Sequence, residues 1–132
     1  MIGIDTNVLI RFLVDDDPRQ NRLARKLLSG RGLDDPAFVS AVTIVETVWV
    51  LNRTLGYAMP DIIAMLRTLL ASDGLVLEFG RELGLLLGDE TASEADLADY
   101  LIAWAGRVAG CEKTVTFDKK SATTIPSMEL LA

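Results

Sequence analysis

Short apolar segments alternate with amphipathic segments along almost the whole chain. Four apolar segments of strand length, 2–5, 36–40, 75–79 and 113–117, are separated by stretches in which apolar residues recur at helical spacing. A weaker fifth segment spans 127–131. Strands joined through helices pair in parallel, and helices cover both faces of a parallel sheet. The alternation therefore predicts an α/β fold, a three-layer α/β/α sandwich with a mainly parallel sheet of four or five strands.

Capping residues and glycines mark where the intervening helices begin and end. Asp17 followed by Pro18 combines an N-cap with a proline at the first helical position. Gly56 and Gly110 are expected to end two helices, and Ser93 is expected to cap the later one. The expected helices are 7–14, 18–30, 41–55, 60–70, 82–87 and 93–109.

Length and composition are those of one globular domain. The 132 residues, half of them apolar and 24% charged, predict a single domain over 1–132. The start of the chain lacks a signal-peptide pattern, and the longest apolar stretch, 37–51, is shorter than the roughly 20 residues of a membrane helix. Cys111 is the only cysteine, so neither an internal disulfide nor a thiolate metal cage can form. We therefore expect a cytoplasmic protein without a membrane span.

The chain contains no histidine and has a formal net charge of −6. Without histidine, catalysis by a Ser-His-Asp or Cys-His pair, or by an imidazole acid and base, is excluded. The acidic balance disfavours loose electrostatic binding of nucleic acid, because phosphate contacts require clustered lysine and arginine. Carboxylates or metal ions must carry any catalysis, and any contact with RNA must be local.

Four carboxylates are candidates for that chemistry. Asp5 and Asp118 follow predicted strands, and ligands of parallel sheets bind at the carboxyl ends of strands. Each is also explained as an ordinary turn or helix-capping aspartate. Glu46 and Asp99 have apolar or small residues one helical turn away, so we expect both on inward faces, where an unpaired carboxylate is costly. Inward carboxylates repel one another unless Mg²⁺ or Mn²⁺ binds, so the pattern predicts a divalent-metal site.

Two of the helical acids have structural alternatives that the residues alone leave open. Glu46 could form an ion pair with Arg53 or with another basic residue. Asp96 stands three residues after Ser93, which is the spacing of a capping box. Asp96 also shares a helix face with Asp99, so it could equally support the acidic cluster from its edge.

The acids stand in four motifs: Ile4-Asp5-Thr6-Asn7-Val8-Leu9, Glu46, Ala95-Asp96-Leu97-Ala98-Asp99 and Thr116-Phe117-Asp118-Lys119. In this order and spacing they resemble the PIN-domain ribonucleases, in particular the VapC-type toxins of bacterial and archaeal toxin-antitoxin systems. The resemblance covers nearly the whole chain. The opening motif alone is weakly specific, whereas the four motifs together are quite specific.

The resemblance implies that four carboxylates bind one or two Mg²⁺ or Mn²⁺ ions: Asp5, Glu46, Asp99 and Asp118. It implies supporting roles for Thr6, Thr116 and Asp96, although Thr6 could equally be a helix N-cap and Thr116 an ordinary strand hydroxyl. The implied reaction is endonucleolytic hydrolysis of RNA by water, which leaves a 3′-hydroxyl and a 5′-phosphate. The implied partners are an RNA substrate, a cognate antitoxin that covers the site, and a second copy in a homodimer.

Two further patterns concern these partners. The helices between 49 and 66 have more apolar residues than one small core clearly requires, which fits either a dimer surface or plain core packing; these residues are Trp49, Leu51, Leu55, Tyr57, Met59, Ile63 and Leu66. The segment from Arg19 to Lys26 holds the densest basic group of the chain. It could guide RNA or form only a solvated face.

Two other functions fit part of the sequence. A phospho-acceptor signalling domain also has about this length and an acidic Mg²⁺ pocket. It needs an acceptor aspartate after a central strand, where this chain has Gly80 and Arg81, and it leaves Glu46 and Asp99 unexplained. A catalytically inactive PIN-like binding module would keep the fold without cleaving RNA, and the complete acidic set argues against it.

Overall fold

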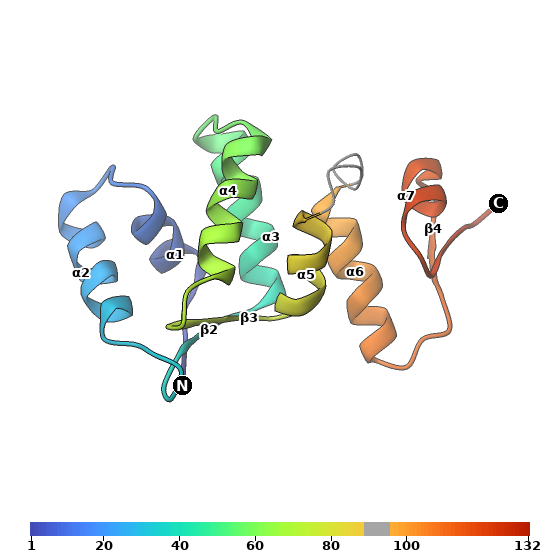
Figure 1. Ribbon diagram of the computed structural model, residues 1–132. Helices are drawn as coiled ribbons and strands as arrows, with labels where there is room; N and C mark the ends of the chain where they lie inside the picture. Colours follow the sequence, from blue (N-terminus) through green and yellow to red (C-terminus); the bar gives the residue numbers. More distant parts are fainter. Residues whose placement is uncertain (89–95) are drawn as a thin grey trace. The chain divides into compact units, whose positions relative to one another are not determined.

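The computed structural model describes residues 1–88 and 96–132 (Figure 1). Its internal contacts divide the chain into two compact units, unit 1 (Met1–Gly80) and unit 2 (Arg81–Ala132), and each is described by itself. Ser93, the expected cap of the later helix, lies outside the described residues. No helix in the described ranges is long and apolar enough to cross a membrane.

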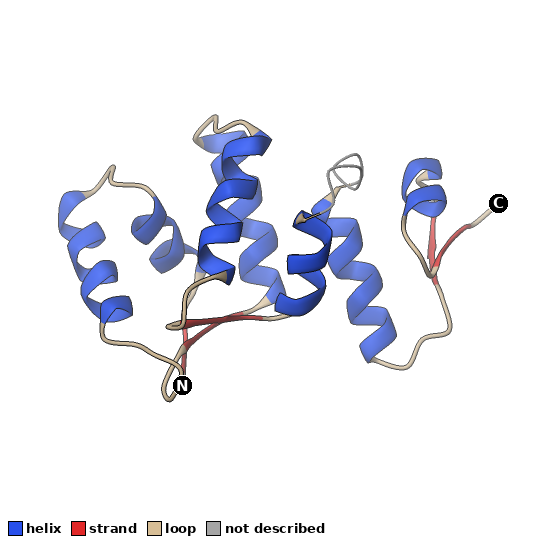
Figure 2. Cartoon of the chain, viewed as in Figure 1, coloured by secondary structure: helices blue, strands red, loops and turns tan. Residues whose placement is uncertain are grey.

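Unit 1 is built on a three-stranded parallel sheet (Figure 2). Strand β2 (Ala37–Val39) lies between β1 (Ile2–Gly3) and β3 (Leu75–Leu77), and Ala37 is paired with Ile2 on one side and Leu75 on the other. The helices of this unit are α1 (Thr6–Leu13), α2 (Pro18–Ser29), α3 (Ala41–Trp49), which continues into the π-helical turn η1 (Val50–Thr54), and α4 (Met59–Leu70).

The helices of unit 1 begin where side chains satisfy the first free backbone N–H groups. The Asp17 carboxylate accepts a hydrogen bond from the backbone N–H of Gln20 at 3.1 Å, which confirms the predicted N-cap. The Ser40 hydroxyl accepts one from Thr43 N at 3.2 Å. Glu78, directly after β3, accepts one from Ala41 N at 2.7 Å and so ties β3 to the start of α3.

The core of unit 1 is made by its four α-helices, η1, β2 and β3. Its largest fully buried side chains in the residues up to 80 include Leu9, Val39, Ile44, Leu51, Ile62, Leu66 and Leu69. Burying each of these aliphatic side chains contributes about 1.5–3 kcal/mol. This packing fixes the carboxyl ends of the strands, where Asp5 and Ser40 lie.

Unit 2 contains a two-stranded parallel sheet and the remaining helices. Its elements are α5 (Gly80–Leu87), which begins at the last residue of unit 1, α6 (Leu97–Val108), β4 (Thr114–Thr116), α7 (Lys119–Thr124) and β5 (Met128–Leu130). A small core forms around Tyr100, Ala103 and Ile125. Gly106 allows α6 to approach β4 closely, because a Cβ there would lie 2.7 Å from Thr114 Oγ1.

The α/β class and the parallel pairing are confirmed. All five expected strands are present and every strand pair is parallel. They form a three-stranded and a two-stranded sheet instead of the single four- or five-stranded sheet that we expected. Each strand is only two or three residues long, so the ladders are shorter than the apolar segments suggested. Helix α7 was not expected.

Candidate active site

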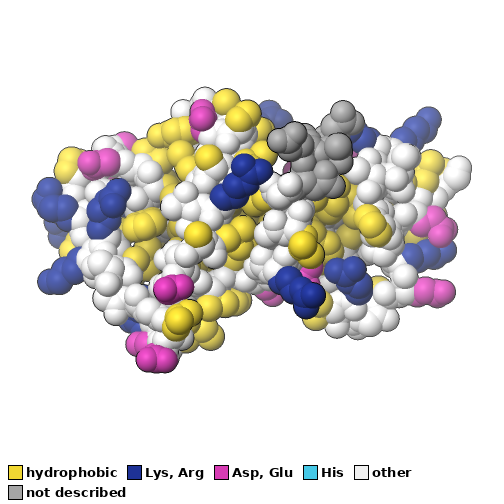
Figure 3. All heavy atoms as spheres, viewed as in Figure 1, with side chains coloured by type: hydrophobic (Ala, Val, Ile, Leu, Met, Phe, Trp, Pro, Cys, Tyr) yellow, Lys and Arg dark blue, Asp and Glu magenta, His cyan; other side chains and the backbone are white. Residues whose placement is uncertain are grey.

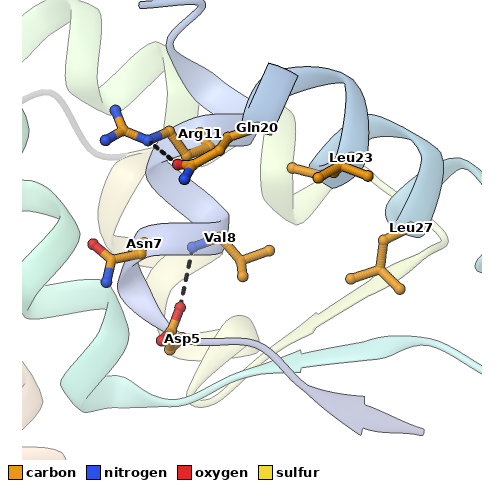
Figure 4. Close-up of a pocket in the computed structure, with 8 residues that line it drawn as sticks. Asp5, Asn7, Val8, Arg11, Gln20, Leu23 and Leu27 are labelled. Carbon is orange, nitrogen blue, oxygen red and sulfur yellow. Dashed lines mark hydrogen bonds between the residues drawn. The ribbon is translucent and has the colours of Figure 1, made fainter. Parts of the chain in front are cut away.

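Asp5 lies at the junction of β1 and α1. It caps α1, since its Oδ1 accepts a hydrogen bond from Val8 N at 3.1 Å, and its side chain is exposed (Figure 4). The capping interpretation is therefore confirmed, and the cap falls to Asp5 and not to Thr6, the half-buried first residue of the helix. Oδ2 of Asp5 makes no hydrogen bond with the described chain, so this oxygen can serve as a ligand.

Glu46 lies on α3 and is exposed, so the expectation of an inward position is wrong. The buried face of α3 consists of Thr43, Ile44 and Thr47. The pattern misled because two apolar neighbours of Glu46 at helical spacing, Val42 and Trp49, are themselves 68% and 60% exposed. Glu46 forms no salt bridge with Arg53 or any other basic residue of the described chain, so the ion-pair alternative is not realised either.

Asp99 lies in the first turn of α6 and is half-buried. Its Oδ2 accepts a hydrogen bond from the hydroxyl of Ser121, on α7, at 2.8 Å. Ser121 is only 2% exposed, so this hydrogen bond is shielded from water. Ser121 was not among the predicted site residues. Its one available signal was its position three residues after a potential N-cap, Asp118.

Asp118 caps α7 directly after β4. Its Oδ1 accepts hydrogen bonds from Lys120 N at 2.9 Å and Ser121 N at 3.1 Å. The backbone N–H of Asp118 donates to Thr116 Oγ1 at 3.0 Å, so Thr116 holds Asp118 in place. Ser121 therefore contacts both acids, Asp118 through its backbone and Asp99 through its hydroxyl. The structure brings these two carboxylates together.

Asp96 is itself the N-cap of α6. Its Oδ1 accepts a hydrogen bond from Ala98 N at 3.0 Å, and its side chain is exposed. The expected capping box, in which Asp96 would be the third helical residue, is therefore wrong, because α6 begins only at Leu97. A capping role is nevertheless present, and it engages one carboxylate oxygen.

The sequence model of the PIN domain family matches residues 2–124. The chain belongs to the PIN-domain family. The matched region includes residues of both units and every candidate acid from Asp5 to Asp118. No curated protein matches the chain. Membership in the PIN family indicates nuclease activity in general, with RNA as a suggested substrate, and PIN-domain nucleases generally use divalent metal ions.

The donor chemistry of this PIN domain suits such ions. Asp5, Asp99 and Asp118 each engage one carboxylate oxygen in the described chain and leave the other without a partner there. Carboxylate oxygens are the ligands that Mg²⁺ and Mn²⁺ prefer. The acids are divided between the units, with Asp5 and Glu46 in unit 1 and the other two in unit 2. Among residues 1–88 and 96–132, no three acidic or cysteine side chains already lie close enough to hold one metal ion.

Proposed function

We propose that this PIN domain is a Mg²⁺- or Mn²⁺-dependent endoribonuclease and the toxin of a type II toxin-antitoxin pair. In this proposal the metal-binding residues, with one or two ions, are Asp5, Glu46, Asp99 and Asp118. The observation that carries it is the pairing of Asp99 and Asp118 through the buried Ser121, with one oxygen of each acid left for a cation. The family match across both units supports a single catalytic domain over 1–132.

The residues of the chain position the reacting groups. When bound, the metal ion supplies Lewis acidity and lowers the pKa of water. The N-cap hydrogen bond of Asp5 fixes one of its oxygens and orients the other, and Thr116 does the same for Asp118 through the backbone. Because the chain has no histidine, no imidazole can activate the ribose 2′-hydroxyl. Direct attack by water then leaves 5′-phosphate and 3′-hydroxyl ends.

Exposed apolar residues support the proposed homodimer and antitoxin contacts. Leu51 and Leu66 belong to the core, whereas Trp49, Leu55 and Met59, on α3 to α4, are exposed. Clusters of exposed large apolar side chains are typical of protein interfaces. We propose that a second copy of the chain binds at this surface and that an antitoxin covers the acids in the cytoplasm.

The decisive experiment incubates the purified chain with structured RNAs in Mn²⁺ or Mg²⁺, with an EDTA control, and maps the cleaved ends. Asp5→Ala and Asp99→Ala should abolish cleavage. Asp17→Ala is the matched control, because Asp17 caps α2 with the same 3.1 Å geometry as Asp5 but lies outside the acidic motifs. Its activity should equal that of the unmodified chain, with all variants shown to be folded by circular dichroism.

The alternatives give different results in the same samples. Cleavage that survives EDTA or either substitution would sink the proposed mechanism. Binding of Mn²⁺ without cleavage of any RNA would indicate an inactive binding module. Uptake of phosphate from acetyl phosphate would indicate the signalling domain, although Glu78, directly after β3, already accepts a hydrogen bond from Ala41 N at the start of α3.

A further inference from the structure

Two adjoining pockets lie along α2 in unit 1. The first, of about 340 Å³, is lined by Asp5, Asn7, Val8, Arg11, Gln20, Leu23, Ala24 and Leu27 (Figure 4). The second, of about 440 Å³, shares Leu23 and Leu27 with the first and is completed by Lys26, Gly30, Arg31 and Asp35. The two leucines therefore form a ridge between the pockets, and the candidate catalytic residue Asp5 lies in the wall of the first.

The ridge presents two apolar side chains to solvent. Leu23 is 56% and Leu27 36% exposed, although the opposite face of the same helix buries Ala24 and Leu28 in unit 1. Apolar side chains held in a hollowed surface mark a binding site more often than a free surface. The polar groups that line the first pocket are the amides of Asn7 and Gln20, the Asp5 carboxylate and the Arg11 guanidinium. Gln20 accepts a hydrogen bond from Arg11 Nε at 2.7 Å through Oε1, so its amide N–H₂ group is still able to donate.

A basic stripe runs beside the pockets. Arg19, Arg22 and Lys26 are exposed. Arg19 and Arg22 directly precede residues that line the first pocket, and Lys26 itself lines the second. Since successive helical residues are about 100° apart, Arg22 and Lys26 are displaced by about 100° around α2 from Leu23 and Leu27, which follow them. None of the three forms a salt bridge with the described chain. Figure 3 shows basic side chains gathered over this helix. In a chain of net charge −6, this face is a local exception that attracts anions.

We infer that this face of unit 1 binds a single-stranded segment of RNA, with bases in the two pockets and phosphates on the basic stripe. The inference rests on the proposed function and adds where the substrate is held. Apolar pockets beside unpaired cations match the alternation of base and phosphate along one strand. Leu23 and Leu27 contact base faces, and the amides of Asn7 and Gln20 hydrogen-bond base edges. The stacked bases of a duplex cannot enter such pockets.

Binding is tested separately from cleavage. The probe is a fluorescein-labelled, single-stranded RNA of 12 nucleotides and mixed sequence, in Ca²⁺ and over a series of salt concentrations, with fluorescence anisotropy as the readout and a gel to show that the RNA stays intact. The stripe variant is Arg19→Gln/Arg22→Gln/Lys26→Gln. Its control, Arg81→Gln/Arg107→Gln/Lys113→Gln, removes three positive charges from exposed positions of unit 2. The ridge variant is Leu23→Ser/Leu27→Ser.

Loss of three phosphate contacts on a single strand should reduce the slope of log affinity against log salt by about 2. The stripe variant should also bind about 10-fold more weakly or worse at moderate salt, while the control keeps the affinity and slope of the unmodified chain. The ridge variant should bind more weakly with an unchanged slope, since it removes base contacts and no charge. A 12-base-pair duplex should compete poorly.

Other results would overturn the inference. These are an unchanged slope in the stripe variant, equal binding of the duplex, or no binding of the single strand by the unmodified chain. Unchanged affinity in the ridge variant would mean that bases do not occupy the pockets, and that the leucine ridge binds a protein segment instead. Failure of the proposed function would give a different result. The unmodified chain would still bind RNA and the stripe variant would still bind it more weakly, but no metal-dependent cleavage would occur.

Discussion

The two units hold their acids in different ways. In unit 1, Asp5 has a single hydrogen bond to its own helix, and Glu46 is exposed on α3 without a salt bridge in the described chain. In unit 2, Asp99 and Asp118 are linked by the buried Ser121. A carboxylate that is fixed before the cation arrives loses less conformational freedom on binding. The two candidate ligands of unit 2 are therefore preorganised, whereas those of unit 1 are free to adapt to a cation.

Their cores differ as well. Unit 1 buries aliphatic side chains from four helices, η1 and two strands. The buried apolar residues of unit 2 within the described ranges are fewer: Leu83, Leu87, Tyr100, Leu101, Ala103 and Ile125. A segment as short as unit 2 rarely gains enough apolar burial to be stable by itself. The comparison predicts that unit 2 unfolds together with unit 1, in agreement with the proposed single domain.

The largest expected effect tests this dependence. Ile44→Ala, in the core of unit 1, should reduce the free energy of unfolding by about 2–5 kcal/mol. The chain has two tryptophans, Trp49 in unit 1 and Trp104 in unit 2, so Trp104→Phe and Trp49→Phe make single-tryptophan proteins that report on one unit each. The urea concentration at the midpoint of unfolding should fall, and both tryptophans should report the same lower value.

A reciprocal variant serves as the control for this experiment. Ile125→Ala, in the core of unit 2, should likewise lower the midpoint seen by both tryptophans. If the Trp104 signal kept its original midpoint in Ile44→Ala, the units would unfold independently and the single-domain proposal would be wrong.

The next effect tests the preorganisation of unit 2. Ser121→Ala removes the hydroxyl that donates to Asp99 Oδ2 at 2.8 Å, so the affinity for Mn²⁺ should fall about 10- to 100-fold. Isothermal titration with Mn²⁺ and cleavage as a function of metal concentration both measure this change. Saturating metal should restore most of the cleavage rate, because the ligands themselves remain.

Thr123→Ala is the matched control, since it removes another hydroxyl of α7 that donates only to Lys119 O. Its metal affinity should not change. An equal loss of affinity in both variants would mean that the hydroxyl of Ser121 stabilises α7 and does not position Asp99.

Strong local signals made much of the fold predictable. The Asp17-Pro18 pair and the glycines at 56 and 110, both with positive φ, lie at the helix ends where we expected them. Helix α7 was not predicted, because Lys119–Thr124 has no apolar periodicity. The helix depends instead on its N-cap, Asp118. The π-helical turn η1 has no sequence signal that separates it from the end of α3.

The candidate site was predictable where an acid follows a strand and less so elsewhere. Asp5 and Asp118 lie at strand ends because chain order alone places them there. The burial of Glu46 was mispredicted because apolar neighbours at helical spacing need not be buried. Ser121 could not be paired with Asp99 in advance, because the two are 22 positions apart and meet only through tertiary packing.

A smaller effect compares two caps in unit 1. Asp5→Ala and Asp17→Ala each remove a 3.1 Å N-cap hydrogen bond, so each should reduce the free energy of unfolding by about 1 kcal/mol. Chemical denaturation measures both values. With stability losses matched in this way, a loss of cleavage in Asp5→Ala alone would reflect the lost ligand and not the weakened helix. A much larger loss of stability in Asp5→Ala would remove this separation.

The smallest effect concerns the exposed ion pairs. Hydrogen bonding by the N-terminal ammonium, at 2.6 Å, and then the charge of Arg31 lower the pKa of Asp35 below its ordinary value of 3.8. A carboxyl group whose pKa is lower in the folded chain stabilises the fold at pH values above its ordinary pKa. This contribution is lost as the pH falls through the lowered pKa. N-terminal acetylation should therefore raise the pKa of Asp35 toward 3.8, as measured by NMR titration of its carboxyl carbon. Lys113→Gln, which breaks the exposed ion pair with Glu129 in unit 2, should leave that titration unchanged. If acetylation left it unchanged too, Arg31 alone would hold the carboxylate, and the N-terminus would have no part in anchoring unit 1.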